Sequence, residues 1–253
     1  MRMPGVKTLR QSARWLRSRF SGGALILGYH RVAKVDSDSH GLCVSPQHFA
    51  EQLEALRRLA RPVALHELVR GLQTGTLPRR AVALTFDDGY LDVLQQAYPL
   101  LEAYQVPATV FVVSDYLGRQ FWWDTIAEEN SQVRSLTSEE LCRLAGTALI
   151  DVGAHSVSHP TLAALPAGEQ WIEIEESKAK LEEILGQAVH AFSYPHGSTS
   201  AATREMVRSA GYDYACSSAN DVARAASDRF ELPRFWPQDW NGETFERWLR
   251  WWL

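Results

Sequence analysis

The chain has 253 residues, of which 45% are hydrophobic and 22% are charged, and its net charge is −4. This length allows one large domain or two small ones, and the composition is that of a soluble globular protein. The lack of a basic excess argues against a nucleic-acid partner. The three cysteines, Cys43, Cys142 and Cys216, are scattered and form no CxxC pair, so neither a disulfide framework nor a zinc–thiolate site is expected.

A basic segment opens the chain, because residues 1–20 include six arginine or lysine side chains and no acidic one. We predict that residues 1–22 form a separate basic segment, and a helix of this composition can lie on an anionic membrane surface. A solvated helix packed on the domain is the alternative. The segment has no apolar stretch long enough for a signal peptide or a membrane span. We therefore expect a cytoplasmic protein, with peripheral association at the inner face of the membrane as a further option.

From residue 24 onward, predicted strands and helices alternate. Apolar runs predict strands at 24–30, 62–65, 81–88, 108–113, 149–155, 189–194 and 213–217, and helical spacing predicts helices at 46–60, 66–73, 91–105, 168–185 and 200–210. Thr137 and Glu140 have the spacing of a capping box and predict a further short helix. Residues 33–44 look like a loop, and 114–135 are interpreted as a loop or small excursion over the site.

Alternating strands and helices indicate βαβ units and a parallel sheet. About seven such units in this length favour a closed α/β barrel over an open sheet. We predict a barrel domain over residues 23–240 and a Trp-rich C-terminal helix over 241–253. The tryptophans fit packing against the barrel, a dimer interface or contact with a membrane.

Several predicted strands end in residues that can do chemistry: His30, the pair Asp87–Asp88, His155 and the turn at 195–197. In a barrel, functional groups gather at the carboxyl ends of the strands, so these residues are expected to converge. Adjacent strand residues point to opposite sides, so one acid of the pair can bind a metal while the other takes a proton. A surface Asp-Asp-Gly turn is the alternative.

His155 and His159 are four residues apart, a spacing that on a helical turn puts both imidazoles on one face, where they can hold one metal ion. With one carboxylate they make a three-ligand set that leaves positions open for water and substrate, as in catalytic sites. One divalent metal is therefore expected. Zinc is the default for these ligand types, and cobalt, nickel or manganese fit nearly as well.

Two motifs resemble those of a known family. Thr85–Gly89 reads TFDDG and His155–Pro160 reads HSVSHP, and both are similar to motifs of the polysaccharide deacetylases, the NodB-homology domains of carbohydrate esterase family four. The resemblance extends over residues 24–235. It implies a distorted (β/α) barrel, a divalent metal held by Asp88, His155 and His159, and Asp87 as the general base. It also implies removal of an N-acetyl or related acyl group from a sugar.

Residues 193–197, which read SYPHG, align only partly with the family's R-x-P-Y-G motif. The resemblance implies that the backbone N–H at His196 binds the oxyanion, a role that needs no particular side chain. Tyr194 belongs to the same oxyanion and substrate-binding turn. Ser193 replaces the arginine that in the family steadies the base aspartate. Arg234 lies in an extended segment and is predicted to reach Asp87 from a different strand, with a surface arginine as the alternative.

The family's leucine-x-histidine motif near the C-terminus is missing, since residues 245–253 contain no histidine. Some family members that make or modify exopolysaccharides carry the acid histidine on the first strand, and Leu27–Val32, which reads LGYHRV, resembles that motif. His30 is therefore predicted to be the general acid, with a pKa raised by a nearby carboxylate. A buried histidine that supports the barrel is the alternative.

The sequence thus predicts a metal-dependent hydrolase that removes N-acetyl or related acyl groups from a sugar in a polysaccharide or glycoconjugate. The basic N-terminus and the C-terminal tryptophans favour a lipid-linked sugar. The rival hypothesis is a catalytically inactive carbohydrate-binding protein with the same fold, which the missing arginine and the missing C-terminal histidine would suit.

Overall fold

Short apolar runs form the strands at the centre of the molecule, as expected for strands that are buried on both faces. The computed structural model describes residues 23–35, 38, 41–121 and 133–253. Seven strands pair in one sheet, and all of these pairings are parallel. The strands are β1 (Leu25–Tyr29), β4 (Arg61–Pro62), β5 (Ala81–Phe86), β6 (Ala108–Val112), β7 (Ile150–Ala154), β8 (Ala191–Ser193) and β9 (Tyr214–Cys216). Their order is β1-β5-β6-β7-β8-β9, with β4 beside β5, which confirms the predicted α/β barrel of about seven strands.

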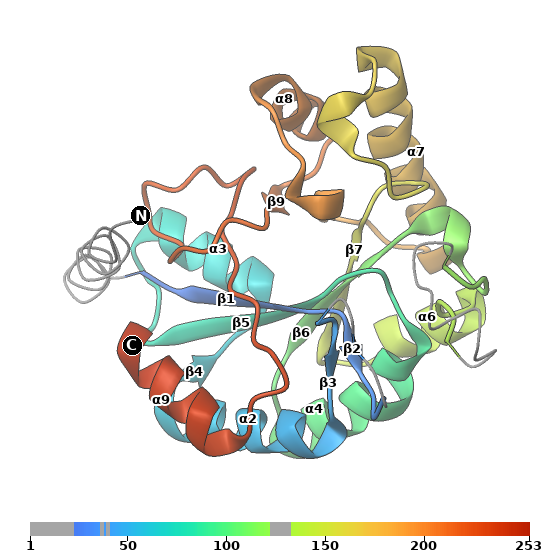
Figure 1. Ribbon diagram of the computed structural model, residues 1–253. Coiled ribbons are helices and arrows are strands. Elements are labelled where there is room, and N and C mark those ends of the chain that lie inside the picture. Colours follow the sequence, from blue (N-terminus) through green and yellow to red (C-terminus); the bar gives the residue numbers. More distant parts are fainter. Residues whose placement is uncertain (1–22, 36–37, 39–40, 122–132) are drawn as a thin grey trace, which may run out of the picture.

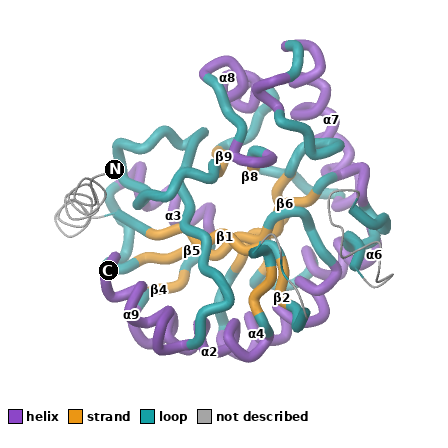
Figure 2. The backbone as a smooth tube through the Cα atoms, in the orientation of Figure 1, coloured by secondary structure: helices purple, strands orange, loops and turns teal. Residues whose placement is uncertain are grey.

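Helices surround these strands on the outside (Figures 1 and 2). They are α2 (Pro46–Leu59), α3 (Leu65–Thr74), α4 (Tyr98–Tyr104), α6 (Ser138–Ala145), α7 (Ala167–Leu185), α8 (Ala201–Ser209) and α9 (Gly242–Trp252). Short 3-10 turns occur at η2 (Ser114–Tyr116), η3 (Leu162–Ala164) and η4 (Pro195–Gly197). Side-chain caps fix several boundaries: Ser45 caps α2, and Thr137 with Glu140 forms the predicted capping box of α6.

One local prediction is confirmed and another needs correction. The region predicted as helical at 91–105 forms a π-helical turn, η1 (Val93–Ala97), followed by α4, and Pro99 stands in the first turn of α4, where its missing N–H is tolerated. The predicted loop at 33–44 ends in β3 (Cys43–Val44), which pairs in parallel with β2 (Arg31–Val32). Strands of two residues are too short to show a period. The predictions for residues 1–22 and 122–132 lie outside the described residues.

An extended segment closes the barrel between its first and last strands. Main-chain hydrogen bonds tie Leu232 to β9 and Phe235 to β1, and both bridges are parallel. Figure 1 shows this orange-red stretch crossing β1 and β5 on its way to α9. Arg234 lies between the two anchor points, so closure of the barrel also carries this side chain to its place.

Parallel register aligns the carboxyl ends of the strands. The last residues of β1 and β5 pair directly, so His30 and Asp87 follow at neighbouring strand ends. β7 lies between β6 and β8, and His155 follows β7 directly. Residues 30, 87, 155 and 195–197 therefore meet at one edge of the sheet, as barrel geometry predicts.

The C-terminal helix α9 packs against α2. The ring centroids of Trp248 and Trp252 lie 5.5 and 4.6 Å from that of Phe235, so these two partly buried tryptophans pack against the core, in agreement with the packing interpretation. Trp251 is 47% exposed. Among the described helices, none is both long enough and apolar enough to cross a membrane.

Gly153 in β7 leaves no space for a side chain, and this yields a prediction about packing. A Cβ atom there would lie 2.5 Å from Phe111 Cδ1 and 2.9 Å from the carbonyl oxygen of Ala191. The strands must shift to accept it, so Gly153→Ala should lower the free energy of unfolding, measured in urea, by roughly 1–3 kcal/mol.

Gly168→Ala on α7 is the matched control. No atom lies within 4 Å of a Cβ placed at Gly168, and alanine favours helix over glycine, so this variant should be as stable as the wild type or more stable. Equal losses in both variants would contradict the close packing of β6 on β7.

Candidate metal and catalytic site

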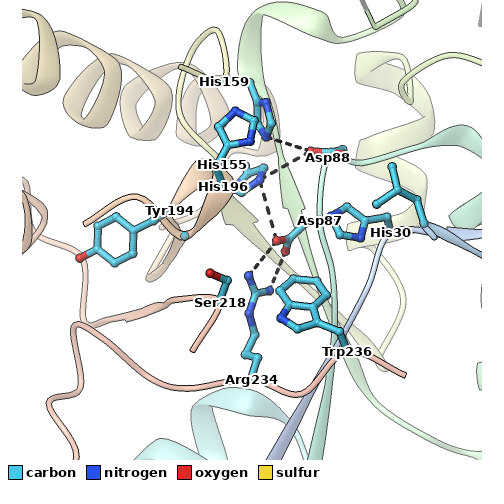
Figure 3. Close-up of a pocket in the computed structure, with 12 residues that line it drawn as sticks. His30, Asp87, Asp88, His155, His159, Tyr194, His196, Ser218, Arg234 and Trp236 are labelled. Carbon is cyan, nitrogen blue, oxygen red and sulfur yellow. Dashed lines mark hydrogen bonds and ion pairs between the residues drawn. The ribbon is translucent and has the colours of Figure 1, made fainter. Parts of the chain in front are cut away.

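The Asp-Asp-Gly turn at the end of β5 sends its two carboxylates in different directions. Asp88 has φ 68° and Gly89 has φ 75°, so the chain turns sharply in left-handed backbone, which glycine adopts freely and aspartate only at a cost. Asp87 faces Arg234, whereas Asp88 faces the two histidines of the HSVSHP motif (Figure 3). The two acids thus occupy different environments, although the left-handed turn at Asp88, beyond the end of β5, separates them and not strand alternation.

The two histidines come from a loop after β7, and the predicted helical turn is wrong. Residues 155–159 contain no helix, and Ser156 and His159 have left-handed φ values of 64° and 65°. Ser156 Oγ accepts a hydrogen bond from His159 N at 2.9 Å, which closes a tight turn. The ring centroids of His155 and His159 are 5.0 Å apart, so the imidazoles still converge, by a different route.

Asp88, His155 and His159 form a compact group of ligand atoms. These atoms all lie within 4.8 Å of one another, the three residues are buried, and no other such group occurs in the described part of the chain. Asp88 Oδ1 lies 3.5 Å from His155 Nε2 and 3.4 Å from His159 Nε2.

The chemistry of this donor set fits a divalent metal. His155 Nδ1 lies 2.7 Å from the carbonyl oxygen of Ser193, which can only accept, so Nδ1 carries the proton and Nε2 presents its lone pair to the group. Burial is the main cause that lowers the pKa of His155 and the pKa of His159, the latter to about 2. Both imidazoles are therefore neutral, which is the form that binds metal. Two imidazoles and a carboxylate also form known catalytic zinc sites.

Arg234 holds Asp87 through two parallel hydrogen bonds. Nη1 donates to Oδ1 and Nη2 to Oδ2, each at 2.7 Å, and Arg234 is only 1% exposed. Its other N–H groups donate to Ser217 O, Thr85 Oγ1 and Ser193 Oγ at 3.0, 3.0 and 2.9 Å. All five donors of the guanidinium are thus used. This placement matches the expectation that Arg234 reaches the aspartate from a different strand.

The environment of Asp87 keeps it ionised. Burial acts to raise the pKa of Asp87, but the charge of Arg234 and its hydrogen bonds hold that pKa well below its usual range. Ser193 Oγ also donates to Asp87 Oδ2 at 3.2 Å. The small Ser193 side chain, at the position of the motif's arginine, thus joins Asp87 and Arg234 in one hydrogen-bond network.

His30 lines the same cavity and stacks on Trp236, with 5.1 Å between ring centroids. Burial, the largest effect, lowers the pKa of His30 to about 4, although Asp87 acts in the opposite direction. The predicted rise of this pKa is therefore wrong, because the loss of hydration and the charge of Arg234 outweigh the carboxylate. In the resting protein His30 is neutral at neutral pH.

Tyr194 and His196 belong to the turn after β8. The Tyr194 hydroxyl donates to Phe230 O at 2.8 Å, and its ring points away from Asp87 in Figure 3. A substrate contact at Tyr194 is thereby limited to the main chain. His196 has φ 57°, and its ring centroid lies 4.5 Å from that of His159, so His196 borders both the metal-ligand group and the cavity.

These residues surround one cavity of about 450 Å³. Sequence reasoning missed three other side chains that line it, Leu42, Ser218 and Trp236. Trp236 could have been predicted from the sequence, because residues two apart in an extended segment share a face and Arg234 stands two positions earlier. Its ring centroid lies 4.6 Å from the guanidinium carbon of Arg234. Leu42 and Ser218 belong to loops without a motif or a period.

The family model for polysaccharide deacetylases matches residues 74–215, more than half of the 253 residues. The matched range includes the Asp-Asp-Gly turn, the histidine loop and the turn at 195–197. His30 and Arg234 lie outside it. The matched range therefore covers the metal-ligand group and Asp87, while His30 and Arg234, predicted to replace missing family features, come from segments on either side of it.

Two curated relatives are similar to almost the whole chain. The poly-β-1,6-N-acetyl-D-glucosamine N-deacetylase of Staphylococcus aureus (strain MRSA252) is 24% identical over 251 residues, which cover 90% of this chain and 82% of the relative. The protein of the same name from Staphylococcus epidermidis (strain ATCC 35984) is 22% identical over 253 residues, which cover 90% of this chain and 83% of the relative.

Two solved structures have a similar fold. The Streptococcus pyogenes deacetylase PplD, in complex with acetate, has a TM-score of 0.77 at 25% identity, with 90% of this chain and 98% of that chain covered. IcaB from Ammonifex degensii has a TM-score of 0.75 at 25% identity, with 91% and 97% covered. By its motifs, its fold and the family match, this chain belongs to the polysaccharide deacetylase family.

Proposed function

We propose that the protein is a divalent-metal-dependent N-deacetylase that removes acetyl groups from a β-1,6-linked N-acetylglucosamine polysaccharide. The observation that carries the proposal is the shared cavity, in which the Asp88–His155–His159 group lies beside Asp87 and its partner Arg234. The sugar and its linkage are drawn from the relatives whose names state this activity, which match 90% of the chain.

Asp88, His155 and His159 would hold the metal, which would supply a Lewis acid that lowers the pKa of a water molecule and polarises the amide carbonyl. We assign Asp87 as the base that takes a proton from the attacking water at a carboxylate oxygen. Because Arg234 makes Asp87 a weak base, proton transfer to Asp87 requires an acidified water. The activity is therefore expected to depend on the metal.

We assign His30 as the group that protonates the leaving nitrogen. One proton leaves the attacking water and one must reach the nitrogen, because an amide anion leaves poorly. His30 is neutral at rest, so it must take up a proton from solvent before it can donate one to the nitrogen, and negative charge that develops on the attacked carbonyl favours this protonated form. The proton that Asp87 takes from the water returns to solvent when the products leave. The backbone N–H of His196 is assigned to that developing oxyanion.

A catalytically inactive carbohydrate-binding protein with this fold is the second candidate. The weak basicity of Asp87 and the neutrality of His30 favour it. The paired geometry of Asp87 and Arg234 favours the enzyme, because binding a neutral sugar needs no buried anion held in one plane by two hydrogen bonds.

A lipid-linked sugar is the alternative substrate, and peripheral association at the inner face of the membrane is a further proposal. Their support is the basic stretch at residues 1–20, outside the described residues, and the exposed Trp251 on α9. Trp248 and Trp252 give less support, because both are partly buried and pack against the core.

Acetate release tests the proposed function. The zinc-loaded protein should release acetate from β-1,6-linked N-acetylglucosamine oligosaccharides faster than from β-1,4-linked oligomers of equal length or from a lipid-linked N-acetylated sugar. A coupled acetate assay measures the rates. Chelation should abolish the activity, and added zinc or cobalt should restore it, because the water must be acidified before Asp87 can take its proton.

Binding of the oligosaccharides by metal-loaded protein without any acetate release would contradict the enzyme and support the binding protein. Acetate release from the β-1,4-linked or lipid-linked compounds alone would support the deacetylase reaction but contradict the assigned substrate.

His30→Ala tests the proton donor. The variant should lower kcat on the N-acetyl substrate by ~10²–10⁴-fold with unchanged metal content. It should lower kcat far less on an activated ester such as 4-nitrophenyl acetate, whose leaving group departs without a proton. Equal losses on both substrates, or loss of metal, would mean that His30 supports the structure instead.

The pKa of His30 gives a second check that needs no substrate. Its folded value of about 4 lies below the ordinary value of ~6.5, so between these pH values the unfolded chain binds a proton that the folded chain does not. The free energy of unfolding of metal-free protein should be highest above pH ~6.5 and fall as the pH drops toward 4. His30→Gln should reduce this slope by up to about 1.4 kcal/mol per pH unit, and an unchanged slope would contradict the low pKa.

A further inference from the structure

The loop that carries the two histidine ligands has an unfavourable backbone conformation. Six non-glycine residues in the described chain have positive φ, and two of them, Ser156 and His159, lie in this five-residue loop. Such conformations are unfavourable for residues other than glycine and persist only where the surroundings impose them. On one side, the main chain of residues 114–115 holds the loop in this conformation: its N–H groups donate hydrogen bonds to Ser156 O at 3.1 Å and to Val157 O at 3.0 Å.

Glu173 on α7 holds the other side of the loop. Its Oε2 accepts hydrogen bonds from Val157 N and Ser158 N, both at 2.9 Å, and its Oε1 accepts one from Ser158 Oγ at 2.6 Å. One carboxylate therefore fixes both residues that lie between Ser156 and His159. Hydrogen bonds to an ionised acceptor are shorter and stronger than those to a neutral one.

We infer that Glu173 is a positioning residue for the metal: its carboxylate fixes the 155–159 loop in the conformation that brings His159 Nε2 beside Asp88 and His155. The inference rests on the proposed metal-dependent function. Glu173 does not line the cavity and belongs to neither sequence motif, so it acts on the metal only through the loop.

The position of Glu173 predicts which quantity changes when it is removed. Without the carboxylate, two backbone N–H groups lose their acceptor, and the left-handed conformations at Ser156 and His159 are held from one side only, by the main chain of residues 114–115. Metal binding must then order the loop as well, so the affinity falls. Once metal is bound, the three ligands have the same geometry, so kcat at saturating metal stays close to the wild-type value.

Metal titration tests the inference. Metal-free wild type, Glu173→Ala and Glu175→Ala are titrated with Co²⁺ against a chelator of known affinity, and binding is followed by the visible absorption of the bound ion. Glu173→Ala should bind 10–100-fold more weakly, the range found for partners that orient metal ligands. Glu175, an exposed glutamate on the same helix, is the matched control, and its alanine variant should bind as the wild type does.

Glu173→Gln separates hydrogen bonding from charge. Its amide oxygen can accept from both backbone N–H groups and its NH₂ can donate to Ser158 Oγ, so most of the affinity should return. Should Glu173→Ala fail to fold, Glu173→Asp carries the test, because it keeps the charge but withdraws the oxygens by one methylene and should also weaken binding.

Wild-type metal affinity in folded Glu173→Ala or Glu173→Asp, with only a lower melting temperature, would overturn the inference and leave Glu173 as a structural contact. Absence of metal binding by the wild type would instead overturn the proposed function. The two failures are therefore distinguishable in one experiment.

Discussion

The buried ion pair between Asp87 and Arg234 is the interaction on which the site depends. The side chains are 4% and 1% exposed, and removing such charges from water costs several kcal/mol per ion. Only near-ideal geometry offsets that cost, and here two hydrogen bonds of 2.7 Å and three further acceptors satisfy the whole guanidinium. Because either charge alone would be strongly unfavourable, the segment that carries Arg234 must dock between β9 and β1 as the barrel closes. The segment that closes the barrel thus also completes the site.

The same pair sets the electrostatics of the cavity. Arg234 keeps Asp87 ionised and contributes to the low pKa of His30, while burial keeps the two ligand histidines neutral. The resting cavity therefore presents neutral imidazoles beside Asp88, a donor set suited to a cation. The arrangement has a chemical cost, because a carboxylate with a low pKa accepts a proton reluctantly. In the proposed reaction an acidified water and a charge that develops beside His30 compensate for it.

The barrel and the core of the site were predictable because their signals are local in sequence. The run before Asp87 is apolar and short, and the Asp-Asp-Gly and HSVSHP segments each keep their groups within five or six residues. Arg234 was predictable only as the replacement for an arginine that the 193–197 turn lacks. Its actual partners span three strands, and no local pattern encodes them.

The errors have physical causes as well. A four-residue histidine spacing is shared by a helical turn and by the tight turn that Ser156 closes, and nothing in the sequence signals left-handed backbone at serine and histidine. The direction of the pKa shift of His30 depends on how much water the fold removes, which residue order does not reveal. Glu173 belongs to a helix that reads as an ordinary charged amphipathic segment, and only the tertiary structure brings it to the histidine loop.

Metal content tests most directly the central claim, that the two adjacent acids have separate tasks. Each protein is loaded with zinc, freed of excess metal and analysed for zinc per chain by mass spectrometry, with circular dichroism to confirm folding. The account predicts about one equivalent in the wild type and in Asp87→Asn, and a large loss in Asp88→Asn. Full zinc content in Asp88→Asn, or its loss in folded Asp87→Asn, would contradict the division of roles on which the site and the proposed function rest.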